Sequence, residues 1–194
     1  MVIVGLDLAG VETRPTDFCV LTGMRVETCL TYTDDNILIR IRAALPQIIA
    51  VDAPLSLPPG RQSIEQRTEV HLRECDRELL RRRIRFFPIT LGPMRKLTVR
   101  GMKLKGVLES QGFNVIEAYP GGAQDVLGIP RKQQGLDKLR KGLENLGLRN
   151  LNARMSDHEL DAVTCAYVGK LFLENKSVMY GPPEQAIVMP TGCG

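Results

Sequence analysis

The sequence lacks both a long apolar run and a basic leader. No apolar stretch in its 194 residues approaches the ~18 residues that a membrane-spanning helix needs. The chain begins directly with VIVGLDLAG at residues 2–10, which has the pattern of a buried strand. We therefore expect no membrane span, no signal peptide and a cytoplasmic location. Internal repeats and low-complexity segments are also absent, and the length favours one domain.

Cysteine is scarce and scattered. The five cysteines stand at positions 19, 29, 75, 165 and 193, and no two of them form a CxxC pair. This spacing argues against a zinc site. We expect these cysteines to be buried, reduced thiols, which is the usual state of cysteine in a cytoplasmic protein.

Familiar catalytic and phosphate-binding motifs are missing as well. No Ser–His or Cys–His pair points to a side-chain nucleophile. Gly10 and the pair Gly121-Gly122 make neither the GxxxxGK[ST] loop nor the GxGxxG turn. These absences leave the acidic residues as the main candidates for chemistry.

The charge that the sequence does have is unevenly spread. The net charge is +4, yet residues 61–105 carry thirteen Lys and Arg against five acids, an excess of +8 that leaves −4 on the rest. This pattern is typical of a protein that binds a polyanion near a carboxylate site. The candidates for phosphate contacts are Arg73, Arg77, Arg81, Arg82, Arg83 and Arg85. The alternative is a solvated helix whose charges pair with one another.

Hydrophobic patterning predicts an α/β fold. Strands are expected at residues 2–8, 17–21, 25–32, 48–52 and 113–117, and helices at residues 36–45, 63–83, 96–110 and 157–174. The tail could add one small terminal strand. This order implies a mixed five-stranded sheet, its first three strands antiparallel, with helices on both faces. We expect a single domain over residues 1–194 with a basic helical insertion at about 57–111.

Three acids stand at the ends of apolar strands. Asp7 follows VIVGL, Asp52 follows IIAV and Glu117 follows FNVI. A carboxylate that leaves water costs several kcal/mol unless it is paired or binds a metal, and no Lys or Arg is adjacent to any of the three. Because ligands of open α/β sheets bind beyond the carboxyl ends of strands, we expect these acids to converge on one site.

A helix near the end of the chain supplies further acids. Asp157 and Asp161 are four residues apart and so share one helical face. Small residues after Asp161, among them Ala162 and Gly169, would let this helix lie close to the sheet and bring Asp161 near Asp7. Clustered carboxylates without a His or Cys cluster favour Mg²⁺ or Mn²⁺. Two such ions ~4 Å apart can promote phosphodiester cleavage.

Each of these acids also has a structural interpretation. Asp7 and Asp52 could accept backbone N–H bonds in turns, and Glu117 could pair with an arginine of the insertion. Ser156-Asp157-His158-Glu159 matches a capping box, in which Asp157 is useful at the helix N-terminus. We expect His158 to lie at the surface, next to the site, where it could carry a proton.

The strand-end GLDLAG, the strand-end VDAP and the late helix DHELDA resemble the ribonuclease H-like superfamily, in particular its RuvC-type resolvase branch. With EAYPGG and the arginine-rich insertion, the chain from Val2 to about Phe172 is similar to the family called domain of unknown function 429, described as predicted nucleases of RNase H fold. The resemblance implies an RNase H-like sheet. It also implies catalytic or metal-binding roles for Asp7, Asp52 and Asp161, with Asp157 as a further candidate ligand.

The chain departs from the superfamily pattern in three places. Residues 36–45 contain no acid, whereas RNase H proper has a Glu in its first helix. The acids of the last helix are four residues apart rather than three. Glu117 matches the narrower family only.

The leading hypothesis is a nuclease that depends on Mg²⁺ or Mn²⁺ and acts on DNA or RNA. Its expected catalytic residues are Asp7, Asp52, Glu117 and Asp161, and its expected metal ligands are Asp7, Asp52, Asp161 and Asp157. One alternative is a non-catalytic nucleic-acid-binding protein of the same fold. Another is an ATP-dependent phosphotransferase of the actin or sugar-kinase type, although the chain is short for that class and has no adenosine motif.

Overall fold

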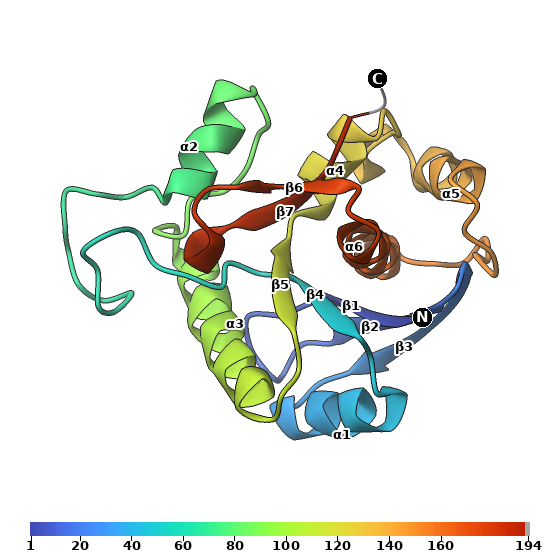
Figure 1. Ribbon diagram of the computed structural model, residues 1–194, viewed down its shortest axis with the longest axis horizontal. Coiled ribbons are helices and arrows are strands. Elements are labelled where there is room, and N and C mark those ends of the chain that lie inside the picture. The colour runs from blue at the N-terminus through green and yellow to red at the C-terminus, as the bar shows by residue number, and fades with distance from the viewer. Residues whose placement is uncertain (193–194) are drawn as a thin grey trace.

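The computed structural model describes residues 1–192, in which seven strands form one sheet in the order β3-β2-β1-β4-β5-β7-β6 (Figure 1). The strands are β1 (Val2–Asp7), β2 (Thr16–Thr22), β3 (Arg25–Thr31), β4 (Ile48–Asp52), β5 (Val115–Ala118), β6 (Ser177–Tyr180) and β7 (Ile187–Pro190). The first three strands are antiparallel, and β1, β4, β5 and β7 run parallel. The expected mixed α/β class is therefore confirmed.

The prediction of five strands is wrong because the tail forms two strands. β6 and β7 make an antiparallel hairpin, and β7 pairs in parallel with β5. All four residues of β7 are buried. Gly181, with a φ of +91°, follows β6 in a left-handed conformation that favours glycine. Strands of four residues carry too little pattern to be recognised without their neighbour in the sheet.

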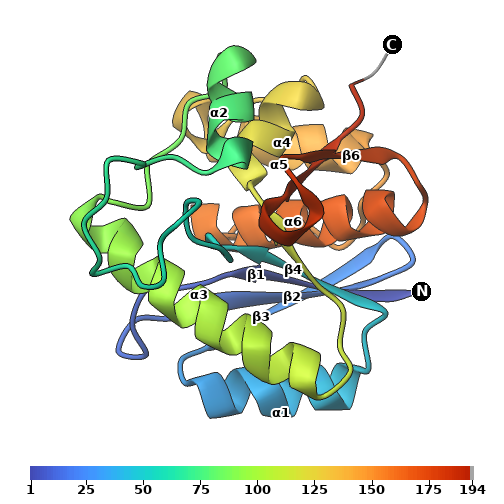
Figure 2. The same cartoon turned by 60° about the vertical axis from the view of Figure 1, so that its left-hand side comes forward.

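Helices cover both faces of the sheet, as predicted (Figure 2). They are α1 (Asp34–Ala44), α2 (Glu74–Arg81), α3 (Gly92–Ser110), α4 (Pro120–Val126), α5 (Leu136–Asn145) and α6 (Asp157–Leu173), with short 3₁₀ turns η1 (Lys132–Gln134) and η2 (Pro183–Gln185). On one face, Ile37 of α1 and Leu104 of α3 pack against alternate residues of β1 and β4 such as Leu6. On the other face, α6 packs against Ile3 and Ile48.

The predicted helix over residues 63–83 is wrong for most of its length. Residues 61–73 are turns and irregular segments, and only α2 is helical. Arg73 lies directly before α2, where it binds Asp76 of that helix and Glu117 of β5. The next helix begins at Gly92 rather than at residue 96.

The contact between β1 and α6 is unusually close. A Cβ atom placed on Gly5 would lie 2.1 Å from the carbonyl oxygen of Ala162 and 2.5 Å from the backbone nitrogen of Ala166. A Cβ on Gly169 would lie 2.8 Å from the side chain of Ile3. Small residues therefore let the backbone of α6 rest on the central strand, as the sequence predicted.

We expect Gly5→Ala to lower the free energy of unfolding by at least about 1–3 kcal/mol, because the new methyl group overlaps backbone atoms that cannot move independently. Gly106→Ala is the matched control. Gly106 lies in α3 with no atom near its Cβ position, so alanine there should stabilise by about 0.5–1 kcal/mol. Urea unfolding measures both, and equal effects of the two substitutions would contradict the close contact.

Two further expectations concern composition. None of the helices within residues 1–192 has the length and apolar character needed to span a bilayer. In the same residues the cysteines are free: Cys19, Cys75 and Cys165 are buried, and Cys29 is partly buried. Burial raises the pKa of the Cys19 thiol, which keeps it protonated. Cys193 lies outside the described residues.

Candidate active site

Asp7 and Asp52 lie side by side at the carboxyl ends of two parallel strands. They are register partners in the pairing of β1 with β4. Because alternate residues of a strand share a face, Asp7 lies on the same face as Gly5, which is the face that α6 covers. Asp161 comes from α6, next to Ala162, and its side chain is 7% exposed. The structure thus brings together three of the acids that the sequence singled out.

The carboxylates of this cluster repel one another. Burial, then Asp7, then Asp161, raise the pKa of Asp52 well above its ordinary value. Within residues 1–192, Asp52 makes no hydrogen bond or ion pair, but the charge of Lys132 acts in the opposite direction and lowers its pKa. Burial and the neighbouring acids outweigh this effect of Lys132.

Asp17 is a fourth acid of the cluster, which the sequence analysis did not identify. It is the register partner of Asp7 in the antiparallel pairing of β1 with β2. Burial, followed by repulsion from Asp7, raises the pKa of Asp17 to about 6. Its Oδ1 atom is buried without a hydrogen-bond partner. The hairpin register could have located it, since any residue that pairs with Asp7 faces the same side.

One lysine and one amide approach the cluster. Lys132 of η1 places its Nζ atom 2.8 Å from Oδ2 of Asp161 and 3.1 Å from Oδ2 of Asp157. Gln124 of α4 donates from Nε2 to Oδ1 of Asp161 at 3.0 Å. Burial disfavours the charged form of Lys132, but its bond to Asp161 outweighs this and raises the lysine pKa. Neither residue was predicted, because η1 and α4 have no distinctive sequence signal.

His158 joins the cluster from the first turn of α6. Its Nδ1 atom lies 2.6 Å from Oδ2 of Asp7, while its side chain stays 60% exposed. The hydrogen bond to Asp7 raises the pKa of His158 to about 9. The expected surface position is confirmed, and the contact with Asp7 gives this histidine a proton at the site. The capping box of Ser156 and Glu159 is formed as predicted.

Glu117 lies at the edge of this cluster: it lines a small cavity together with Asp52, and its charge contributes to the raised pKa of Asp52. Its register partner is Val51, not Asp52, so it projects from the opposite face of the sheet. There it accepts hydrogen bonds from the backbone N–H of Leu55 at 2.7 Å and from Arg73 at 2.7 and 2.9 Å. Glu117 thus forms the ion pair with an arginine of the insertion that the structural interpretation described, and a catalytic role for it stays a prediction.

Arg73 is correspondingly not a surface residue. Its side chain is 3% exposed and bridges Glu117 and Asp76. Burial disfavours its charge, but Glu117 outweighs this and raises the arginine pKa. The expectation that Arg73 contacts a nucleic acid is wrong, because both sides of its guanidinium are already bound to carboxylates.

The other arginines expected to contact phosphates differ in whether they form ion pairs. Arg77 pairs with Glu74, and Arg81 and Arg82 both pair with Glu78. Arg82 also lies over the ring of Tyr180, 4.6 Å from its centroid. This arrangement matches the alternative of a solvated, salt-bridged helix. Arg83 and Arg85 follow α2 and make no ion pair within residues 1–192.

The donor set suits a hard divalent cation. All the acids offer carboxylate oxygens, which such a cation prefers. In the described part of the chain, Oδ1 of Asp17 has no hydrogen-bond partner, and Asp52 forms no ion pair with a basic side chain. Among residues 1–192, however, no three His, Cys, Asp or Glu side chains are close enough to hold a metal ion as they stand. Asp161 and Asp157 share Lys132 instead.

Known proteins resemble this one over most of its length. A family model described as "Protein of unknown function (DUF429)" matches residues 5–185. Two solved structures of RuvC from Thermus thermophilus, one in complex with a Holliday junction substrate, are similar in fold. They have TM-scores of 0.55 and 0.51 at 15% and 14% identity, and each alignment covers 97% of this chain and 100% of the RuvC chain. No curated protein matches. The expected likeness to RuvC and its RNase H-like fold is confirmed.

Proposed function

Since the chain belongs to the DUF429 family and has a RuvC-like fold, we propose that it is a metal-dependent nuclease that hydrolyses phosphodiester bonds of DNA or RNA. The observation that carries the proposal is the meeting of Asp7, Asp52 and Asp161 on one face at the carboxyl end of the sheet. Clustered carboxylates repel one another and gain most from a cation. The complex of RuvC with a Holliday junction substrate supports a structured DNA as one substrate to test.

Asp7 and Asp52 would be the first ligands of Mg²⁺ or Mn²⁺, and Asp161 or Asp17 would complete the shell after a side-chain rearrangement. Such an ion, when bound, supplies Lewis acidity towards the phosphodiester and lowers the pKa of water. Lys132 holds Asp161 through Nζ and neutralises part of the carboxylate charge. This lets an anionic substrate approach a site that is otherwise negative.

His158 would move the proton. Its Nδ1 atom is bonded to Oδ2 of Asp7 at 2.6 Å, and its side chain is 60% exposed, so a substrate can reach the ring. Asp7 thereby orients the ring, and Nε2 of the imidazolium can donate a proton to the oxygen that leaves the phosphorus. General acid catalysis of this kind typically contributes ~10²–10⁴-fold. Because water attacks the phosphorus in hydrolysis, the protein needs no nucleophile of its own.

The direct test is cleavage of labelled single-stranded, duplex and four-way-junction DNA, and of single-stranded RNA. We expect cutting of at least one substrate with Mg²⁺ or Mn²⁺ and none with EDTA. If the purified protein cuts nothing in this panel with either ion, a non-catalytic nucleic-acid-binding role replaces the nuclease.

Divalent ions should also stabilise the protein, because they bind the folded carboxylate cluster and relieve its repulsion. At a hundredfold excess over Kd the gain is about 2.7 kcal/mol. Thermal melting in Mn²⁺ against EDTA measures it. The Asp7→Asn, Asp52→Asn double variant should lose the shift.

The matched control for this melting experiment is Asp137→Asn with Glu184→Gln, which removes two acids from helical segments away from the cluster. This control should keep the full shift. An equal shift in the wild type and in the Asp7, Asp52 double variant would rule out the proposed cation site.

A further inference from the structure

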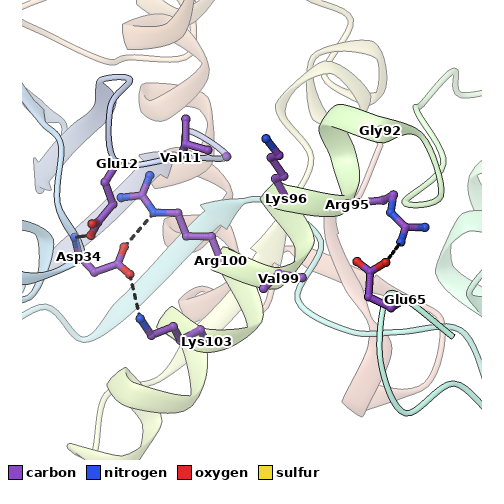
Figure 3. A pocket seen from close by; sticks show the side chains of 11 residues that line it. Val11, Glu12, Asp34, Glu65, Gly92, Arg95, Lys96, Val99, Arg100 and Lys103 are labelled. Atoms are coloured by element: carbon purple, nitrogen blue, oxygen red, sulfur yellow. Dashed lines mark hydrogen bonds and ion pairs between the residues drawn. The ribbon is translucent and has the colours of Figure 1, made fainter.

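An open groove runs between the loop that follows β1 and the helix α3 (Figure 3). Its volume is about 640 Å³. Gly10 and Val11 form one wall, and Lys96, Val99 and Lys103 form the other. Val99 is 51% exposed and gives the α3 wall an apolar surface. Glu12, Asp34 and Glu65 also line the groove, and Arg95 and Arg100 pair with two of these acids. The groove is therefore open and partly apolar, with two lysines on its α3 wall.

The two walls are fixed relative to each other. Arg100 of α3 donates from Nη1 to the carbonyl of Ala9 and from Nη2 to the carbonyl of Tyr32, both at 2.7 Å, and pairs with Asp34 at 2.8 Å. A Cβ on Gly10 would lie 3.3 Å from the backbone nitrogen of Leu97, so the loop rests directly on α3. The groove is thus a preformed feature of the fold.

α3 carries an excess of positive charge, unlike α2, although Arg95, Arg100 and Lys105 each pair with an acid. α3 holds five cations and one acid, whereas α2 holds two cations and three acids. Lys96 makes no ion pair within residues 1–192. Lys103 is 72% exposed and only 3.8 Å from an Asp34 oxygen, an acid that Arg100 already binds. Among the described residues, the groove therefore offers one lysine without an ion pair, Lys96, and one with only a long contact to an acid, Lys103.

The groove begins next to the carboxylate cluster. Gly10 follows Asp7 by three residues, which span at most ~10 Å. Lys96 and Lys103 are seven residues apart, or ~10.5 Å along the helix, so they can contact separate phosphates. A strand that is cut at Asp7 would thus continue past both lysines.

We propose that this groove binds one strand of nucleic acid, with phosphates on Lys96 and Lys103 and the sugars or bases against Val99 and Val11. The inference rests on the proposed nuclease function and names where its substrate lies. The inference adds Lys96 and Lys103 to the candidate phosphate contacts, whereas Arg77, Arg81 and Arg82 are held by Glu74 and Glu78.

The test measures binding without cleavage. Fluorescence anisotropy with a labelled single strand, in EDTA and over a salt series, gives the slope of log K against log salt. Lys96→Gln with Lys103→Gln should flatten that slope by about 1.4, from ~0.7 per phosphate contact on single strands. The corresponding loss of affinity at ~0.1 M salt is about 25-fold.

The matched control is Lys138→Gln with Lys141→Gln, which removes two exposed, unpaired lysines from α5. It should change affinity by less than about twofold beyond the general loss of charge. If the two double variants behave alike, the groove is not the binding site, and the nuclease proposal stands. If the wild type binds no nucleic acid in EDTA, the groove inference is overturned, while metal-dependent cleavage still tests the nuclease function separately.

Discussion

Replacing Asp7 by Asn is expected to lower the rate of metal-dependent cleavage at least ~100-fold, which corresponds to losing about 2.7 kcal/mol of transition-state stabilisation. Asp7 occupies the centre of the cluster, because it is the register partner of both Asp17 and Asp52 and the acceptor for His158. The substitution keeps the shape of the side chain but removes the charge that would hold the cation and orient the imidazole. The measurement is single-turnover cleavage of the best substrate in Mg²⁺ or Mn²⁺.

Two controls separate chemistry from binding and folding. Nucleic-acid binding in EDTA should survive or tighten in Asp7→Asn, since a repulsive negative charge has gone. Asp137→Asn, on the exposed side of α5, should cleave like the wild type. An Asp7→Asn protein that cuts as fast as the wild type would remove the basis for the nuclease proposal.

Replacing Arg73 by Met is expected to lower the free energy of unfolding by about 3–5 kcal/mol, because it leaves buried carboxylates without their counter-charge. Glu117 is 6% exposed and Asp76 is 1% exposed, and both depend on this one guanidinium. Arg77→Met is the control: it breaks the exposed pair with Glu74 and should cost at most ~1 kcal/mol. Urea unfolding distinguishes the two.

The pH dependence of Arg73→Met has a definite sign. Burial already raises the pKa of Glu117 in the wild type, and removing Arg73 removes the main influence that lowers it. A group whose folded pKa lies above its unfolded pKa stabilises below the unfolded pKa, and this stability is lost as pH rises through the folded pKa. The deficit of the variant should therefore be small at acidic pH and grow towards neutrality. A second substitution, Glu117→Gln, should recover part of it, and an equal cost for Arg73→Met and Arg77→Met would contradict the buried cluster.

The sequence predicted Asp7, Asp52 and Asp161 as neighbours for reasons that are local. Two apolar strands end in acids, and neighbouring parallel strands end at the same edge of a sheet. The small residues around Asp161 indicated that its helix lies close to the sheet, and the contact of Gly5 with Ala162 confirms this proximity.

The sequence could not show which face of the sheet Glu117 occupies, because the face depends on the register of β5 against β4. β5 continues to Ala118, so Glu117 pairs with Val51 and faces the opposite side from Asp52. A shift of one residue reverses the face of every side chain in a strand. The sequence also did not predict the hairpin of β6 and β7 or the irregular segment before α2, for a related reason. Their contacts join segments far apart in the sequence, such as Arg73 with Glu117.

The packing of α6 on β1 also determines when the protein can acquire its activity during synthesis. Asp7 leaves the ribosome early, while Asp161 is translated 154 residues later. Until α6 has emerged, the face of β1 that carries Asp7 has no partner helix, and the carboxylate cluster does not exist. If the protein is the nuclease proposed above, a nascent chain would lack the complete site, because the first strand and α6 must meet before Asp161 joins Asp7.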